Sequence, residues 1–529
     1  MWPTLALALL VAATLPACSD DDPDPGAPGG SGAAGSGTGG AAQGGHGPTD
    51  ECSPEGATRC AGTEVEVCVA EGGALTWAEP AACAGEQTCK GAACADPTAE
   101  QLVQASSLEA YVREVAAHTG WHQALDVEGM VAEGRATLVG GDGSDAVFYR
   151  AMHVAHLALR QGHQSLYASQ EACGGVDIHW QNESRFGVCG RPLDDTIVVT
   201  YAAPGNPLGL AAGDRIGGVD GVGGAEILPQ AALRPVCGVV SPSMYGQRTQ
   251  AAASFFGTVP AGAKLDVAAP DDSARVVEVP DGAGEYVSCQ DPFARDIAFN
   301  AQATVRPDGI AVIRLPRFYP IDQTLPQNPT QAELEAFIAE FQAKIVAVFD
   351  EVKDAPALIW DVRGNYGGIT RVGLAIAGGM AGAALTNISY CTQRIPESDP
   401  PAFYPDPYAV YDVTPGGPFS YPGKSAILVD GLDYSAADYF PLAVRKATPT
   451  LIVGTPTAGA YGGPGTLAAL GSIPEMRFDH DVNRCLDALT DEPLEGTTVE
   501  PDIVVEYDPA DLAAGVDTVM EAAAAALRN

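Results

Sequence analysis

In the C-terminal half of the chain, apolar strand-like segments alternate with helix-like segments, and no other pattern limits the possible folds as strongly. Gly309–Leu315, Ala357–Val362 and Ser425–Asp430 are short apolar runs of the kind that is buried inside a parallel sheet. Between the first two, Gln331–Val352 repeats apolar residues at three- and four-residue spacing, as an amphipathic helix does. Strands that alternate with helices predict an α/β domain from Asp296 onward.

Two of the predicted strands run into loops that could support chemistry. The strand that ends at Val362 continues into the glycine-rich turn Arg363–Gly368, whose backbone N–H groups could stabilise a developing negative charge on oxygen. Ser435 follows the strand Ser425–Asp430, at a turn into a helix whose free N–H groups favour an anion. Taken alone, the spacing of Ser435 and Asp438 favours a helix-capping role for the serine.

The N-terminus has the features of an export signal. Leu5–Pro16 is mostly apolar but shorter than the roughly 20 residues that a membrane-spanning helix needs. It ends in Leu-Pro-Ala-Cys18, which resembles a bacterial lipobox and predicts a lipid on Cys18, although the usual basic residues before the apolar run are missing. The alternative is an ordinary secretory signal that is cleaved nearby. Ser19–Asp50 is rich in Gly, Ala and Ser and predicts a flexible tether. We therefore expect an exported protein, anchored by Cys18 alone on the periplasmic or cell-surface side of the envelope.

Thirteen cysteines fit an oxidising compartment. Six of them lie between Cys52 and Cys94 without a C-x-x-C spacing or a histidine among them, which favours a small disulfide module over a zinc site. Six cysteines allow 15 pairings, and the sequence does not select one. We interpret the module as a spacer or an adhesive unit. For the later cysteines, their grouping suggests the pairs Cys173–Cys189, Cys237–Cys289 and Cys391–Cys485.

The net charge of −39 narrows the range of partners. A surface this acidic repels phosphate backbones and anionic lipid headgroups, so we expect no nucleic-acid partner. From Thr98 to about Tyr167, apolar residues recur at helical spacing, and His153 and His156 lie in this stretch. No acidic ligand pattern accompanies these histidines, so we expect neither a metal nor another cofactor.

Between about Arg185 and Cys289 the sequence changes to short β-rich runs broken by Gly and Pro. Gly209–Gly221 closely resembles the G-L-x-x-G-D-x-I-x-x-V-D-G signature of PDZ domains. Phe186, Gly187 and Val188 stand where that family has its carboxylate-binding loop, so the resemblance implies recognition of peptide C-termini by strand addition. The alternative is a β-domain with an ordinary glycine-rich turn.

Several motifs in one order suggest a family. Asp361–Gly368, Asp433–Asp438, Val453–Gly459 and Val499–Ile503 together resemble the tail-specific (C-terminal processing) serine peptidases. The resemblance implies a crotonase-like α/β catalytic core with an inserted PDZ domain and a helical N-terminal segment, preceded by the disulfide-rich module.

One branch of that family uses a Ser–Lys dyad, with the lysine beside a T-x-G motif. Here Ala460 occupies that position. Lys446 is the one lysine that follows Ser435, and eleven helical residues place it roughly 16 Å away, too far for proton transfer. The sequence therefore argues against the dyad.

The tricorn-like branch uses Ser, His and Glu, and the resemblance assigns Ser435 as nucleophile and His163 as base. Glu495 would orient the histidine directly or through a neighbouring hydroxyl, with Glu500 as the alternative. By the same resemblance, the oxyanion donors are the N–H groups of Gly367 or Gly368 and of Ala436.

We therefore predict an exported, lipid-anchored serine endopeptidase that cleaves peptides or unfolded proteins and uses a PDZ domain to recognise substrate C-termini. The alternatives are a catalytically inactive peptide- or ligand-binding protein on the same fold and a structural surface protein that uses the Cys-rich module for adhesion. The expected organisation is a signal peptide at 1–17, a tether at 18–50, the Cys-rich module at 51–97, a helical segment with His163 at 98–184, the PDZ domain at 185–290 and the peptidase core at 291–529.

Overall fold

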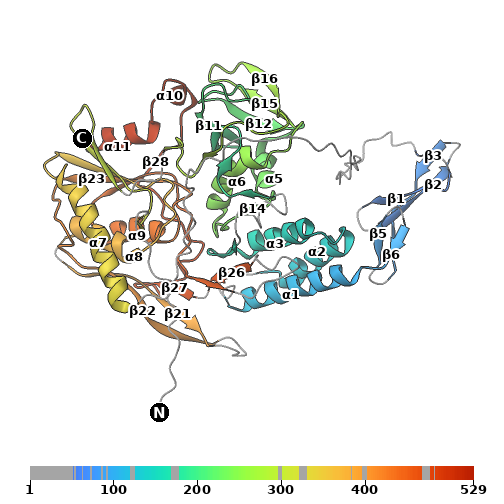
Figure 1. The fold of residues 1–529 in the computed structure, drawn as a ribbon, viewed down its shortest axis with the longest axis horizontal. Helices are drawn as coiled ribbons and strands as arrows, with labels where there is room; N and C mark the ends of the chain where they lie inside the picture. Colours follow the sequence, from blue (N-terminus) through green and yellow to red (C-terminus); the bar gives the residue numbers. More distant parts are fainter. Residues whose placement is uncertain are drawn as a thin grey trace, which may run out of the picture.

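The structure is a computed structural model with a mixed α/β fold (Figure 1). It describes residues 52–528 except for 53–54, 62–63, 72–73, 85–86, 91–92, 119–124, 168–177, 296–300, 321–329, 383, 396–401, 467–476 and 482.

A six-stranded sheet forms the centre of the C-terminal region. Its order is β18 (Gln302–Val305), β19 (Ala311–Arg314), β20 (Ala357–Asp361), β23 (Lys424–Val429), β24 (Leu451–Gly454) and β28 (Ile503–Val504). Only the β18–β19 pairing is antiparallel in this sheet. All residues of β20 are buried, which explains why the central strands read as continuous apolar runs. The α/β prediction is confirmed.

Helices cover both faces of this sheet (Figure 1). Leu358 and Trp360 of β20 face the core that is formed with α7 (Gln331–Asp350), α8 (Thr370–Met380) and α9 (Ala436–Ala447). Ala357 and Ile359 point the other way, toward α11 (Thr518–Arg528). A further short helix, α10 (Pro509–Ala513), precedes α11.

Three helices form the predicted helical segment before the β-rich region. They are α1 (Ala99–His118), α2 (Val127–Gly140) and α3 (Asp145–Leu159), and they share a core that includes Leu108, Leu138 and Met152. None of the helices in the described ranges is both long and apolar enough to cross a membrane.

The β-rich region folds around its own six-stranded sheet. The order is β10 (Val188–Leu193), β11 (Thr196–Ala202), β12 (Arg215–Val219), β15 (Lys264–Ala268) and β16 (Ala274–Glu278), with β13 (Val222–Gly223) paired to β12. The 3₁₀ turn Gly224–Glu226 leads into α5 (Ile227–Ala232), and α6 (Met244–Thr258) follows. Phe255 and Phe256 of α6 pack on Ile197 and Leu265 of the sheet.

Smaller sheets complete the fold, and some of them join segments that are far apart in the sequence. The pairs and triplets are β8 (His179–Trp180) with β14 (Val236–Cys237), β9 (Glu183–Ser184) with β17 (Val287–Ser288), β22 (Phe403–Val413) with β21 (Thr386–Arg394) and β27 (Asn483–Asp487), and β25 (Pro464–Thr466) with β26 (Arg477–Asp481) and β7 (Ser165–Tyr167).

The Cys-rich module lies at the end of α1, apart from the α/β region (Figure 1). Its strands are β1 (Thr58–Ala61), β2 (Glu64–Glu71), β3 (Ala74–Trp77), β4 (Ala81–Ala82), β5 (Thr88–Lys90) and β6 (Ala93–Ala95). Disulfides join Cys52 to Cys68 and Cys83 to Cys94.

The later disulfides correct part of the predicted pairing. Cys391–Cys485 is confirmed, but Cys189 is bonded to Cys289, so the predicted pairs Cys173–Cys189 and Cys237–Cys289 are wrong. Sequence proximity misled the pairing because β10 and the segment after β17 meet in space although 100 residues separate the two cysteines.

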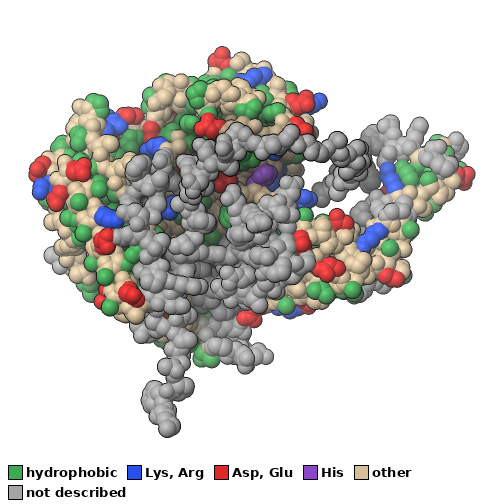
Figure 2. Space-filling model, in the orientation of Figure 1, with side chains coloured by type: hydrophobic (Ala, Val, Ile, Leu, Met, Phe, Trp, Pro, Cys, Tyr) green, Lys and Arg blue, Asp and Glu red, His purple; other side chains and the backbone are tan. Residues whose placement is uncertain are grey.

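Acidic side chains are scattered over the described elements that Figure 2 exposes, rather than gathered in one patch.

Candidate active site

Ser435 adopts an unusual backbone conformation at the start of α9. Its φ of 62° and ψ of −119° differ from those of the other hydroxyl caps Ser144, Ser243 and Thr330, whose backbones are extended. The predicted capping pair with Asp438 is present, and the N–H of Ser435 donates to Oδ2 of Asp438 at 3.1 Å. Capping does not require a positive φ, so the strain at this half-buried serine points to an additional role.

His163 lies on the loop after α3, close to the residue that precedes Ser435. Its backbone N–H donates to the hydroxyl of Tyr434, and its ring meets the Tyr434 ring edge-on with 5.0 Å between the centroids. The imidazole is 9% exposed, and its Nδ1 has no hydrogen-bond partner in the described part of the chain. Burial lowers the pKa of His163 to about 4, which keeps the ring neutral and able to accept a proton.

Glu495 holds the loop that carries His163, but it does so through the backbone. Its Oε1 accepts the N–H of Gly162 at 2.5 Å, and its Oε2 accepts those of Tyr461 at 2.9 Å and Gly462 at 3.0 Å. Burial raises the pKa of Glu495 to about 7. The alternative glutamate, Glu500, instead accepts a hydrogen bond from the hydroxyl of Thr498 and is exposed.

The glycine-rich turn lies against the serine, as the sequence predicts. A Cβ on Gly367 would come within 2.8 Å of both Ala436 N and Ser435 Cβ. The N–H of Gly367 donates to Oδ1 of Asn365 at 2.7 Å, so this donor is already engaged. Within the described ranges, the N–H groups of Gly368 and Ala436 make no hydrogen bond.

Lys446 and Ala460, the two residues that bear on a Ser–Lys dyad, both make structural contacts. Ala460 is buried, and its N–H donates to Oδ2 of Asp438 at 2.9 Å. Lys446 Nζ donates to Asp487 and to the carbonyl of Ile388. Neither residue supplies a base to Ser435.

The β-rich region supports the glycine-rich turn directly. Arg191 of β10 pairs with Oδ2 of Asp430 at 3.4 Å, and Oδ1 of Asp430 accepts the N–H of Gly364 at 3.0 Å. Gln290 Nε2 donates to the carbonyl of Gly364 at 2.7 Å. These contacts, and that between Tyr434 and His163, could not be predicted from local sequence patterns, because each joins residues far apart in the chain.

The predicted carboxylate-binding loop is partly occupied by its own chain. Oγ of Ser184 accepts the N–H groups of Phe186 and Val188 at 3.2 Å, whereas the N–H of Gly187 has no partner in the described structure. A Cβ on Gly190 of β10 would lie 3.2 Å from the carbonyl of Ala252 in α6. Because a Cβ points out of the plane of a sheet, this contact packs α6 on the face of the sheet at β10, which is an end strand of that sheet.

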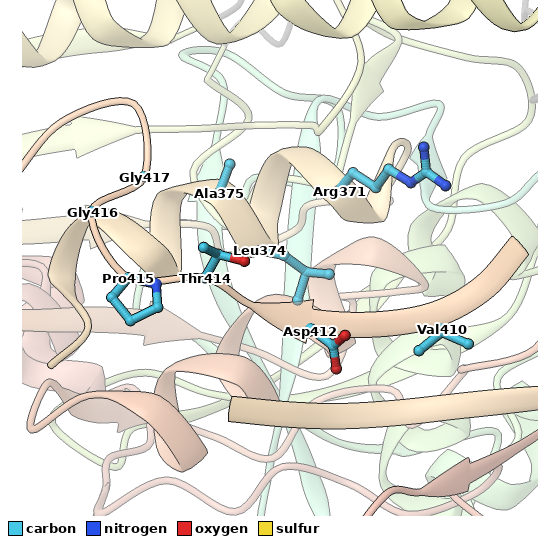
Figure 3. Close-up of a pocket in the computed structure, with 9 residues that line it drawn as sticks. All are labelled: Arg371, Leu374, Ala375, Val410, Asp412, Thr414, Pro415, Gly416 and Gly417. Carbon is cyan, nitrogen blue, oxygen red and sulfur yellow. The ribbon is translucent and has the colours of Figure 1, made fainter. Parts of the chain in front are cut away.

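A surface pocket of about 540 Å³ lies between α8 and β22 (Figure 3). Arg371, Leu374 and Ala375 of α8 line one side, and Val410 and Asp412 of β22 line another. None of the candidate catalytic residues borders it. Among the described residues, no group of three or more His, Cys, Asp or Glu could hold a metal ion.

Comparison with known proteins supports a peptidase. Residues 309–505 match the sequence profile of Peptidase family S41. No curated protein sequence matches the chain. Mature CPAF in complex with lactacystin superposes with a TM-score of 0.59 and 15% identity, over 82% of this chain and 98% of that one.

Two further solved structures superpose on this chain about equally well. Mature CPAF alone gives a TM-score of 0.59 and 15% identity over 82% of this chain and 97% of its own, and a CPAF point mutant gives 0.58 and 14% over 82% and 99%. At this identity the likeness shows a shared fold. Together, the profile match and the fold support a serine peptidase.

Proposed function

We propose that the protein is a serine endopeptidase that cleaves peptides or unfolded proteins with Ser435 as nucleophile and His163 as base. The observation that carries the proposal is the contact of His163 with Tyr434, which brings the imidazole to the residue before the strained serine. The neutral imidazole accepts the hydroxyl proton as Ser435 attacks the scissile carbonyl, and it then protonates the leaving amine.

The charges that develop during this reaction have candidate partners. Among the described residues, two N–H groups near Ser435 are unengaged and suit an oxyanion: that of Ala436, and that of Gly368, which follows the Gly367 in contact with Ser435. Gly367 would join them only if its N–H left Asn365. Glu495 fixes the His163 loop and supplies a nearby negative charge when ionised, which favours the imidazolium that forms.

We extend the proposal to the fold and the β-rich region. The six-stranded sheet with helices on both faces is the arrangement that we interpret as a crotonase-like core, and the region around β10–β16 as an inserted PDZ domain. In that domain Gly187 N–H is a donor for a substrate C-terminus, and the peptide adds a strand beside β10, the end strand of the sheet. A peptide acid should bind much more tightly than its amide, and equal affinities would refute recognition of the carboxylate.

We also propose that the protein is exported and held to the cell envelope by a lipid on Cys18. The support is the apolar run before Cys18 and the disulfides Cys189–Cys289 and Cys391–Cys485, since such bonds persist in oxidising compartments. Cys18→Ala should release the protein from the membrane fraction, and unchanged membrane association would refute the anchor.

The decisive experiment for the activity uses a fluorophosphonate probe, with Ser435→Ala as the matched control. We expect the wild type to be labelled and to digest casein, and the variant to do neither. A folded wild type without labelling or turnover would refute the proposal and favour the inactive peptide-binding alternative.

A further inference from the structure

Two buried carboxylates hold one short strip of backbone behind Ser435. Asp438 Oδ1 accepts the N–H of Gly459 at 2.7 Å, and its Oδ2 accepts that of Ala460 at 2.9 Å. Glu495 takes the next two N–H groups, those of Tyr461 and Gly462, as described above. Four consecutive N–H groups of the Gly459–Gly462 strip therefore point to just two side chains.

Each carboxylate accepts a third hydrogen bond from a backbone N–H group, and this third donor lies in a different part of the site for each. Asp438 accepts the N–H of Ser435, whereas Glu495 accepts the N–H of Gly162, next to His163. The nucleophile and the candidate base are thus connected through the same strip, although they are far apart in the sequence.

Helix capping does not explain this arrangement. A cap needs only the bond between Asp438 and the start of α9, yet two of the three backbone bonds of Asp438 go to the strip. Asp438 is fully buried, and an isolated buried carboxylate is costly unless several donors compensate it. Asp438 is therefore placed to connect the start of α9 with the Gly459–Gly462 strip.

We propose that Asp438 is a positioning residue that, together with Glu495, sets the separation of Ser435 and His163 through the Gly459–Gly462 strip. The inference rests on the proposed peptidase function. A carboxylate has two acceptor oxygens and serves three N–H groups, whereas an asparagine presents one oxygen and turns an NH₂ toward at least one of these donors. Asp438→Asn should consequently loosen the strip without changing the size of the side chain.

The first arm of the test measures kcat, KM and the rate of fluorophosphonate labelling in Asp438→Asn. Asp214→Asn is the control for changing a buried carboxylate elsewhere, because Asp214 of the β-rich region accepts the N–H of Ala211 at 2.8 Å and pairs with Arg275. We expect kcat and labelling to fall about 10–100-fold in Asp438→Asn with KM nearly unchanged, as for a misplaced nucleophile. Wild-type kcat and labelling in a folded Asp438→Asn variant would overturn the inference while leaving the proposed function intact.

The second arm does not depend on catalysis. Hydrogen exchange followed by mass spectrometry reports on peptides that cover the Gly459–Gly462 strip and the loop at Gly162–His163. We expect Asp438→Asn to speed exchange about tenfold in both, and Asp214→Asn in neither. Faster exchange at the strip alone would overturn the link to His163, and this readout stands even if the wild type proves inactive.

Discussion

Lys446 Nζ donates to Oδ2 of Asp487 at 2.6 Å and to the carbonyl of Ile388 at 2.9 Å. These bonds fasten the C-terminal turn of α9 to β21 and β27. The one lysine that follows Ser435 in the sequence is thereby committed to a structural contact.

The first prediction separates the two possible bases. His163→Ala should lower kcat by about 10³-fold or more with the fold intact, because the imidazole is the proposed acceptor of the Ser435 proton. Lys446→Ala should change kcat only slightly and lower the melting temperature. Turnover on casein with circular dichroism as the folding control checks both, and a result with the two variants exchanged would restore the dyad.

The second prediction concerns the close contact of the glycine-rich turn with the serine. Gly367 has a φ of 93°, and a Cβ there would lie 2.4 Å from the carbonyl of Tyr434. Gly367→Ala should therefore displace the oxyanion donors and reduce labelling of Ser435 by about 10²–10³-fold. Gly382→Ala, where a Cβ meets nothing within 4 Å, is the control and should label normally.

The third prediction is the acid limb of the activity profile. The base must be neutral, and burial lowers the pKa of His163 to about 4 rather than the ordinary 6.5. In Glu495→Gln, which lacks the neighbouring group that titrates near pH 7, kcat/KM should thus stay level as the pH falls from 7 to 5 and should drop only near pH 4. A midpoint near 6.5 would show that the imidazole is solvated in the working enzyme.

The fourth prediction concerns the stability contributed by Glu495. Burial raises the pKa of this carboxyl from 4.5 to about 7. Because the folded state retains this proton, its stabilising contribution is complete below pH 4.5 and is lost as the pH rises through 7. Glu495→Gln cannot titrate, so its melting temperature relative to the wild type should increase between pH 4.5 and pH 8. A difference that stays constant across this range would contradict the raised pKa.

The fifth prediction concerns the disulfide between β21 and β27. Cys391 and Cys485 are direct cross-strand partners. The backbone carbonyl of Cys485 also accepts the N–H of Leu494, the residue before Glu495. Replacing both cysteines with serine should lower the free energy of unfolding by about 2–4 kcal/mol and reduce kcat. The same change at Cys83 and Cys94 should leave kcat unaltered, because that bond lies in the Cys-rich module.

The sequence predicted the elements that local patterns determine. The strand expected at Ala357–Val362 is β20 (Ala357–Asp361), because burial on both faces demands a continuous apolar run. The helix expected at Gln331–Val352 is α7, which ends two residues earlier. Both predictions depend only on residues that are close together in the sequence.

What the sequence did not reveal are contacts between distant segments. Asp438 was visible only as a cap for α9, since nothing local shows that Gly459 and Ala460 turn their N–H groups toward it. The partners of Cys189 and Cys289 were missed for the same reason. The placement of α6 against β10 likewise depends on packing that no motif encodes.

The bond between Gly162 and Glu495 spans 333 positions of the chain. A chain that leaves the ribosome N-terminus first therefore presents its histidine loop long before its glutamate. The two halves of the site cannot meet until the segment between them has been made. A chain cut short before Glu495 would accordingly lack the carboxylate that holds the His163 loop, however well its earlier part had folded.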